Sequence, residues 1–99
     1  MIRLTKDNFD SAIADGKTLV DFYTGWCGYC RVTEPVMEEL SVKYAGEMNV
    51  AKVDADSEKE LAERYEVTSL PTIIFFKDGT EMARKTGAYP LEVLEEMVK

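Results

Sequence analysis

The sequence predicts an α/β domain in which a central mixed sheet lies between helices. Two observations support this: candidate strands and helices alternate along the chain, and Asp78-Gly79 is a strong hairpin signal between strands over 72–77 and 81–86. Strands joined through helices run parallel or cross over, whereas the two strands of a hairpin are antiparallel. The predicted order is β-α-β-α-β-α-β-β-α, in a single domain over residues 1–99.

The first half of the chain supplies two strands and two helices. Residues 2–4 predict a short strand, and apolar side chains at helical spacing predict a helix over 6–15. A near-continuous apolar run over 18–23 is typical of a strand buried on both faces. Apolar positions over 32–46 predict a long amphipathic helix, which Pro35 should kink because it lacks an N–H.

The second half begins with another strand of buried type over 48–53. Ser57 and Glu60 have the spacing of a capping box, in which each side chain bonds a backbone N–H at a helix start. A third helix is therefore predicted there. Pro90 suits the first position of a last helix, because that position needs no N–H donor.

Composition and charge exclude several classes of function. Lys and Arg total 12 and Asp and Glu total 19, so the formal charge is −7. Nucleic-acid affinity depends on cationic side chains that displace counterions, so we expect no nucleic-acid partner. No apolar stretch approaches the roughly 18 residues of a membrane span, so we expect no membrane association. The polar first residues do not resemble a signal peptide, and we expect a cytoplasmic monomer.

The cysteine and histidine counts narrow the chemistry further. The chain has no His, which removes imidazole catalysis, and both its cysteines lie in Cys27-Gly28-Tyr29-Cys30. A zinc site would need two more ligands, so we expect no metal, although a dimer bridged by metal through two cysteine pairs is an alternative. A structural disulfide closing so short a loop would contribute only about 2 kcal/mol in the loop-closure model. These exclusions favour redox chemistry.

The two cysteines should have different roles. Cys27 lies where a buried strand gives way to a helix, and helix N-termini carry free N–H groups that favour a thiolate. We therefore expect Cys27 to be the nucleophile and Cys30, inside the helix, to resolve the mixed disulfide. The alternative is that both are small buried apolar residues.

Asp21 interrupts the apolar strand over 18–23. Burying a carboxylate costs several kcal/mol, so a purely structural role is a weak explanation. The functional interpretation makes Asp21 the proton acceptor for Cys30, and the alternative places it at a strand end facing water. Lys52 lies in a buried-type strand and could pair electrostatically with Asp21, or could be a solvated residue of an edge strand.

Motifs along nearly the whole chain, from Leu4 to Val98, resemble the thioredoxin family. They are Val20-Asp21-Phe22, Trp26-Cys27-Gly28-Tyr29-Cys30, Pro35, Val50-Ala51-Lys52-Val53-Asp54, Leu70-Pro71-Thr72, Phe76-Lys77-Asp78-Gly79 and Gly87. The resemblance implies a four- or five-stranded mixed sheet flanked by four helices. It also implies reduction of protein disulfides through a Cys27–Cys30 disulfide, without a bound cofactor, with electrons from NADPH through thioredoxin reductase or an equivalent enzyme.

The resemblance also implies a substrate surface. The family's matching proline is cis and faces the disulfide, so we expect a cis Leu70-Pro71 bond and backbone pairing between Leu70 and an extended substrate. Gly87 should permit close approach to this surface, and Trp26 should contact substrate, although a core position for Trp26 is the ordinary alternative. The expected substrate-binding residues are Trp26, Gly28, Tyr29, Leu70, Pro71, Gly87 and Ala88.

Tyr29 replaces the proline that the family usually has between its cysteines, and Tyr23 and Arg31 also depart from the usual residues. Unlike proline, Tyr29 keeps an N–H that could stabilise the Cys27 thiolate. The dipeptide between the cysteines helps to set the redox potential, so a more oxidising protein resembling a disulfide isomerase is an alternative. A binding module with incidental cysteines is another.

Overall fold

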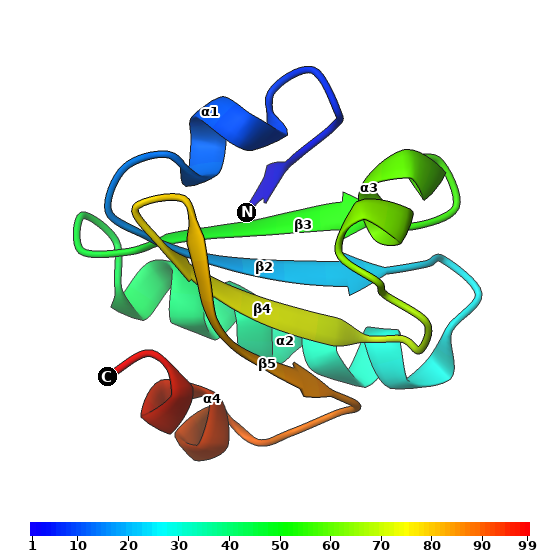
Figure 1. Cartoon of the computed structure of the whole chain (residues 1–99). Coiled ribbons are helices and arrows are strands. Elements are labelled where there is room, and N and C mark those ends of the chain that lie inside the picture. Colours follow the sequence, from blue (N-terminus) through cyan, green and yellow to red (C-terminus); the bar gives the residue numbers. More distant parts are fainter.

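A computed structural model describes residues 1–99 and contains one five-stranded sheet (Figure 1). Its strand order is β1-β3-β2-β4-β5; β1, β3 and β2 are parallel, and β4 and β5 join as antiparallel strands. The predicted mixed sheet is therefore confirmed. The strands are β1 (Ile2–Arg3), β2 (Lys17–Tyr23), β3 (Asn49–Asp54), β4 (Thr72–Lys77) and β5 (Thr80–Thr86).

Four helices cover the two faces of this sheet, as predicted. Figure 1 shows α1 and α3 on one side of the sheet and α2 and α4 on the other. Two separate apolar clusters fill the spaces between sheet and helices. The helices are α1 (Phe9–Ile13), α2 (Gly28–Lys43), α3 (Lys59–Arg64) and α4 (Leu91–Met97).

The alternation of side chains along β2 decides which of its residues faces α2. Val20 and Phe22 belong to the cluster beneath α1 and α3, whereas Leu19 belongs to the cluster beneath α2 and α4. Successive strand residues point to opposite faces, so Asp21 shares the α2 face with Leu19. The strand is buried on both faces, as its apolar run predicted.

Several predicted boundaries differ from the structure. The first helix begins at Phe9 rather than at residue 6, and the Asn8 side chain instead accepts the Thr5 N–H at 2.7 Å in the preceding turn. The capping box was wrong: α3 begins after Glu58, without a side-chain cap, and the Ser57 hydroxyl donates to the Asp54 carbonyl at 3.3 Å.

Two further positions were close to their predictions. We predicted Pro90 as the first helical residue, whereas it is the N-cap of α4 and the first helical residue is Leu91. The hairpin turn is Asp78-Gly79 as expected, with φ of 49° and 84°. Two left-handed residues form the tight turn whose twist matches that of the strands, and β5 accordingly begins at Thr80, one residue earlier than predicted.

Candidate active site

Cys27 forms the N-cap of α2. Its backbone is extended, with φ −84° and ψ 118°, and its sulfur accepts the backbone N–H of Cys30 at 3.2 Å. Both thiols are free; Cys27 is 7% exposed and Cys30 is 4% exposed. The expected placement at the helix start is confirmed, but the N–H that bonds the Cys27 sulfur belongs to Cys30 and not to Tyr29. Free N–H groups of the first turn surround Cys27 with positive partial charge.

The Cys30 thiol is difficult to ionise where it lies. Burial, followed by its hydrogen bond with the Cys27 thiol, raises the pKa of Cys30 to about 12. A thiol with this pKa is protonated at neutral pH. It can act as a nucleophile only if a neighbouring group takes its proton.

Asp21 is a buried carboxyl group without a hydrogen-bonding partner at Oδ1. It is 3% exposed, and no donor of the chain reaches that oxygen. Burial first, and then the negative charge of Glu34, raise the pKa of Asp21 to about 7, while the Lys52 ammonium acts in the opposite direction. Asp21 can therefore exchange a proton near neutral pH. A solvated position at a strand end, our alternative for Asp21, was wrong.

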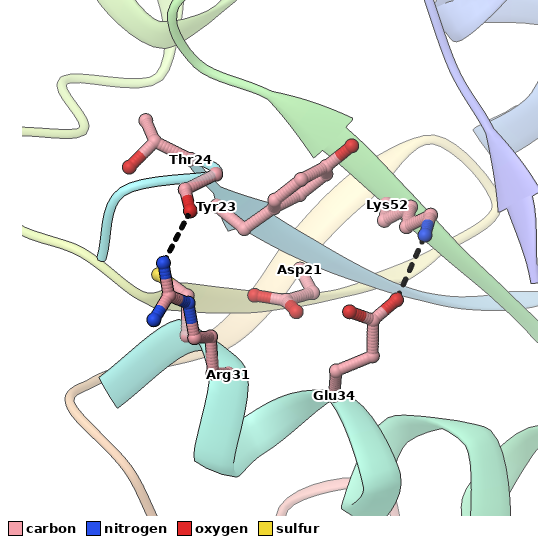
Figure 2. A pocket seen from close by; sticks show the side chains of 8 residues that line it. Asp21, Tyr23, Thr24, Arg31, Glu34 and Lys52 are labelled. Carbon is pink, nitrogen blue, oxygen red and sulfur yellow. Dashed lines mark hydrogen bonds and ion pairs between the residues drawn. The ribbon is translucent and has the colours of Figure 1, made fainter. Parts of the chain in front are cut away.

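A cavity of about 240 Å³ connects Asp21 with α2. Figure 2 shows the carboxyl groups of Asp21 and Glu34 entering this space from β2 and α2. Three of the four predicted catalytic residues line it, and Cys27 lies at the adjacent helix terminus. The lining residues are Asp21, Tyr23, Thr24, Gly25, Cys30, Arg31, Glu34 and Lys52.

Lys52 is beside Asp21 in the sheet but forms its ion pair with another residue. β3 lies between β1 and β2, so Lys52 is not on an edge strand, and its register partner on β2 is Asp21. Its Nζ donates to Glu34 Oε1 at 2.8 Å. Glu34 was not among the residues predicted from the sequence. The available signal was its spacing four residues after Cys30, which places both on one face of a helix.

The two aromatic residues flanking the cysteines are exposed. Trp26 and Tyr29 each expose 70% of their surface, so a core position for Trp26 is excluded. The indole Nε1 of Trp26 donates to Asp56 Oδ2 at 2.7 Å, which ties the ring to the segment after β3. Gly28 is the first residue of α2, and a Cβ atom there would meet open space.

The expected cis peptide bond between Leu70 and Pro71 is present. Pro71 is buried, Leu70 is half-buried and Ala88 is exposed. Gly87 donates its N–H to the Pro71 carbonyl at 2.8 Å, which joins the two segments. Gly87 has φ of +108°, which side chains rarely adopt, and a Cβ there would lie 3.8 Å from the nearest atom of the chain, so within the chain it is the backbone conformation that requires glycine.

The structure contains neither of two other features, a helix that could span a membrane or a cluster of metal ligands. No helix has both the length and the apolar character needed to cross a bilayer. No three or more His, Cys, Asp and Glu side chains are grouped so that they could hold a metal ion.

A free cysteine pair at a helix N-terminus, on a mixed sheet between two helical layers, defines a thiol–disulfide oxidoreductase. Comparison with known proteins agrees: the thioredoxin family model matches residues 1–99. The chain is 41% identical to a thioredoxin of Staphylococcus saprophyticus over 99 residues, covering 100% of this chain and 95% of that protein. It is also 41% identical to a Staphylococcus aureus thioredoxin over 98 residues, covering 99% and 94% of the two chains.

The chain therefore belongs to the thioredoxin family, and the resemblance in its motifs is confirmed. It is an oxidoreductase of the protein-disulfide reductase class, and proteins of this family generally have no prosthetic group.

Proposed function

We propose that residues 1–99 act as one cytoplasmic, monomeric domain that reduces protein disulfides with Cys27 as nucleophile and Cys30 as resolving thiol. The observation that carries this proposal is the Cys27 sulfur at the N-terminus of α2, within 3.2 Å of the Cys30 N–H. One chain holds both cysteines, so the site needs no second subunit. A working dithiol must be kept reduced, which favours the cytoplasm.

In the first step, the Cys27 thiolate attacks one sulfur of a substrate disulfide. A bond forms between Cys27 and that sulfur, and the other substrate sulfur leaves as a thiolate. The free N–H groups at the start of α2 and the Cys30 N–H favour the attacking thiolate.

In the second step, Cys30 gives its proton to the Asp21 carboxylate and attacks the Cys27 sulfur. The Cys27–Cys30 bond forms, the substrate's remaining sulfur leaves as a thiolate, and two electrons have passed to the substrate. The shared cavity and the Asp21 pKa of about 7 support this transfer. Lys52 acts on it through its charge beside Asp21.

Thioredoxin reductase or an equivalent enzyme then restores the dithiol with two electrons from NADPH. No bound cofactor takes part. Exposed Trp26 and Tyr29, together with the half-buried Leu70, support docking of an extended substrate beside the cysteines. The remaining members of the proposed substrate surface are Gly28, Pro71, Gly87 and Ala88.

The reduction potential, measured by equilibration with glutathione, tests this function. Thioredoxins have potentials of about −270 mV, a value of the family and not of this chain, and isomerases have about −180 mV. We expect a value near the first. A value near −180 mV would favour the isomerase alternative. The observation behind this alternative is Tyr29, which stands where the family usually has proline between its cysteines.

A second assay tests the electron source and the binding-module alternative. NADPH, a thioredoxin reductase and a protein disulfide are mixed with the parent chain or with the double variant Cys27→Ser, Cys30→Ser. Oxidation of NADPH in the mixture that contains the parent chain, and not in the mixture that contains the double variant, supports the proposal. Partner binding and cellular function retained by the double variant would instead support a binding module.

A further inference from the structure

The ion pair between Glu34 and Lys52 lies in the cavity that the buried Asp21 also lines. Lys52 is the register neighbour of Asp21 on β3, and its flexible side chain is half-buried. The Nζ atom nevertheless bonds Glu34 Oε1 at 2.8 Å, and Asp21 Oδ1 has no partner in the chain. All three residues line one cavity (Figure 2). The ammonium group of the residue paired with Asp21 in the sheet is thus held by a second carboxylate.

We propose that Glu34 is a positioning residue for the second redox step: it binds the Lys52 ammonium and thereby withholds a cationic partner from Asp21. This inference rests on the proposed role of Asp21 as proton acceptor for Cys30. A direct ion pair with Lys52 would favour the Asp21 carboxylate and make it a weaker base. Glu34 keeps the acceptor basic enough to take a thiol proton.

Among the charged groups around Asp21, Glu34 and Lys52 have the main influence on its protonation. β2 contributes Tyr23 to the cavity and β3 contributes Lys52. On β4, the register partner of Asp21 is the apolar Ile73.

α2 contributes the other polar groups of the cavity: the Cys30 thiol, Arg31 and Glu34. The Arg31 guanidinium donates to the Gly25 carbonyl at 3.3 Å and is exposed. The Cys27 thiol lies beside Cys30 at the start of the same helix.

Removing the Glu34 charge has two effects on Asp21 with the same sign. The negative charge that disfavours the Asp21 carboxylate disappears, and Lys52 becomes free to turn toward its register neighbour. Both effects lower the pKa of Asp21 from its value of about 7. A group whose pKa lies near the working pH is the most effective acid–base catalyst at that pH, so the change also matters for rate.

The test compares Glu34→Gln with the parent in two measurements. The first follows the Asp21 carboxyl by carbon-13 NMR across pH, and the second follows the rate at which Cys30 resolves a mixed disulfide on Cys27. We expect the Asp21 midpoint and the acid limb of the rate profile to move down together by roughly one pH unit. Gln has the shape of Glu, and circular dichroism checks the fold.

Two further variants make the comparison specific. Glu39→Gln removes an exposed charge from the same helix outside the cavity, and we expect both midpoints to stay unchanged. In a Lys52→Met background no ammonium can be released, so Glu34→Gln should produce a smaller shift there than in the parent. The difference between the two shifts measures the part of the Asp21 shift that depends on release of the Lys52 ammonium.

An unchanged Asp21 midpoint in Glu34→Gln, or equal shifts with and without Lys52, would overturn this inference. Asp21→Asn separates that failure from a failure of the proposed function. If Asp21→Asn slows resolution while Glu34→Gln leaves the Asp21 midpoint unchanged, only the inference fails. If Asp21→Asn resolves the mixed disulfide at the parental rate from pH 5 to 9, the acceptor role fails and the inference with it.

Discussion

Asp21 and Cys30 line one cavity from two different elements, the middle of β2 and the first turn of α2. Each has a pKa raised above its ordinary value by burial, to about 7 for the carboxyl and about 12 for the thiol. Burial therefore makes the Cys30 thiol dependent on a base, because it raises the pKa of that thiol. Burial also makes the Asp21 carboxylate a stronger base. The same burial destabilises the fold when Asp21 ionises.

Asp21→Asn should stabilise the protein most at alkaline pH. The folded pKa of about 7 exceeds the ordinary value of 3.8, so the folded chain binds more protons than the unfolded chain between these values. The parent therefore loses stability as pH rises through that window. The full difference is on the order of 4 kcal/mol, an upper bound from about 1.4 kcal/mol per unit.

Urea unfolding of the parent and Asp21→Asn at several pH values between 4 and 9 measures this effect. The stability difference between them should grow from pH 4 to 7 and then level off. Asp15→Asn, which removes an exposed carboxyl, is the matched control and should follow the parent. A difference between parent and Asp21→Asn that does not vary with pH would contradict the buried, neutral carboxyl.

Local pattern was sufficient to predict the strands, their order of occurrence and the place of Cys27. These features depend on side-chain periodicity and on turn residues close in the chain, such as Asp78-Gly79. The ion pair of Lys52 depends instead on how α2 lies across the sheet. The spacing from Cys30 to Glu34 predicts that both lie on one face of the helix. It does not predict that this face packs against the strand residue Lys52.

The conformations around Pro71 and Gly87 also lay beyond local pattern. The cis bond before Pro71 was expected only because the motif resembles the family's. Gly87 needs its positive φ where its N–H turns to bond the Pro71 carbonyl, a contact that joins residues 16 positions apart. The false capping box at Ser57 shows the same limit, because its hydroxyl bonds the preceding strand's end instead.

Cys27→Ser and Cys30→Ser should fail at different steps. Without Cys27 no mixed disulfide forms, because the attacking thiolate is missing. Without Cys30 the first attack succeeds and resolution fails, so covalent complexes with substrate proteins should accumulate. Electrophoresis without reductant, with mass spectrometry of the Cys27 peptide, detects them. Trapping by Cys27→Ser and not by Cys30→Ser would reverse the proposed roles.

The hydrogen bond between Trp26 and Asp56 should order the exposed indole for substrate docking. Asp56→Ala removes the acceptor, so we expect lower fluorescence anisotropy of the chain's single Trp and slower reduction of protein disulfides. Asp56→Asn retains a side-chain oxygen and should preserve both properties. Because the site is exposed, the loss of stability should be small, roughly 1 kcal/mol or less. An anisotropy in Asp56→Ala equal to that of the parent would show that the bond does not order the ring.

Tyr29→Pro should lower the reduction potential slightly, by a route other than a lost hydrogen bond. The donor to the Cys27 sulfur is the Cys30 N–H, which this substitution leaves in place. Tyr29 is the second residue of α2, and its N–H has no acceptor within the chain. That group adds to the positive partial charge at the helix start, which favours the thiolate and hence the reduced form.

Removing this N–H should therefore weaken the reduced form by a fraction of the helix-terminal effect. The whole effect of a helix terminus on a nearby charge, roughly 0.3–1 kcal/mol, corresponds to about 5–20 mV for a two-electron couple. Equilibration with glutathione measures the potential of Tyr29→Pro and of Tyr29→Ala, which removes the exposed aromatic ring but keeps the N–H. We expect a lower potential in Tyr29→Pro alone, because the side chain makes no hydrogen bond near the sulfurs. Equal changes in the two variants would assign the effect to the ring, and a rise in Tyr29→Pro would exclude the N–H as its source.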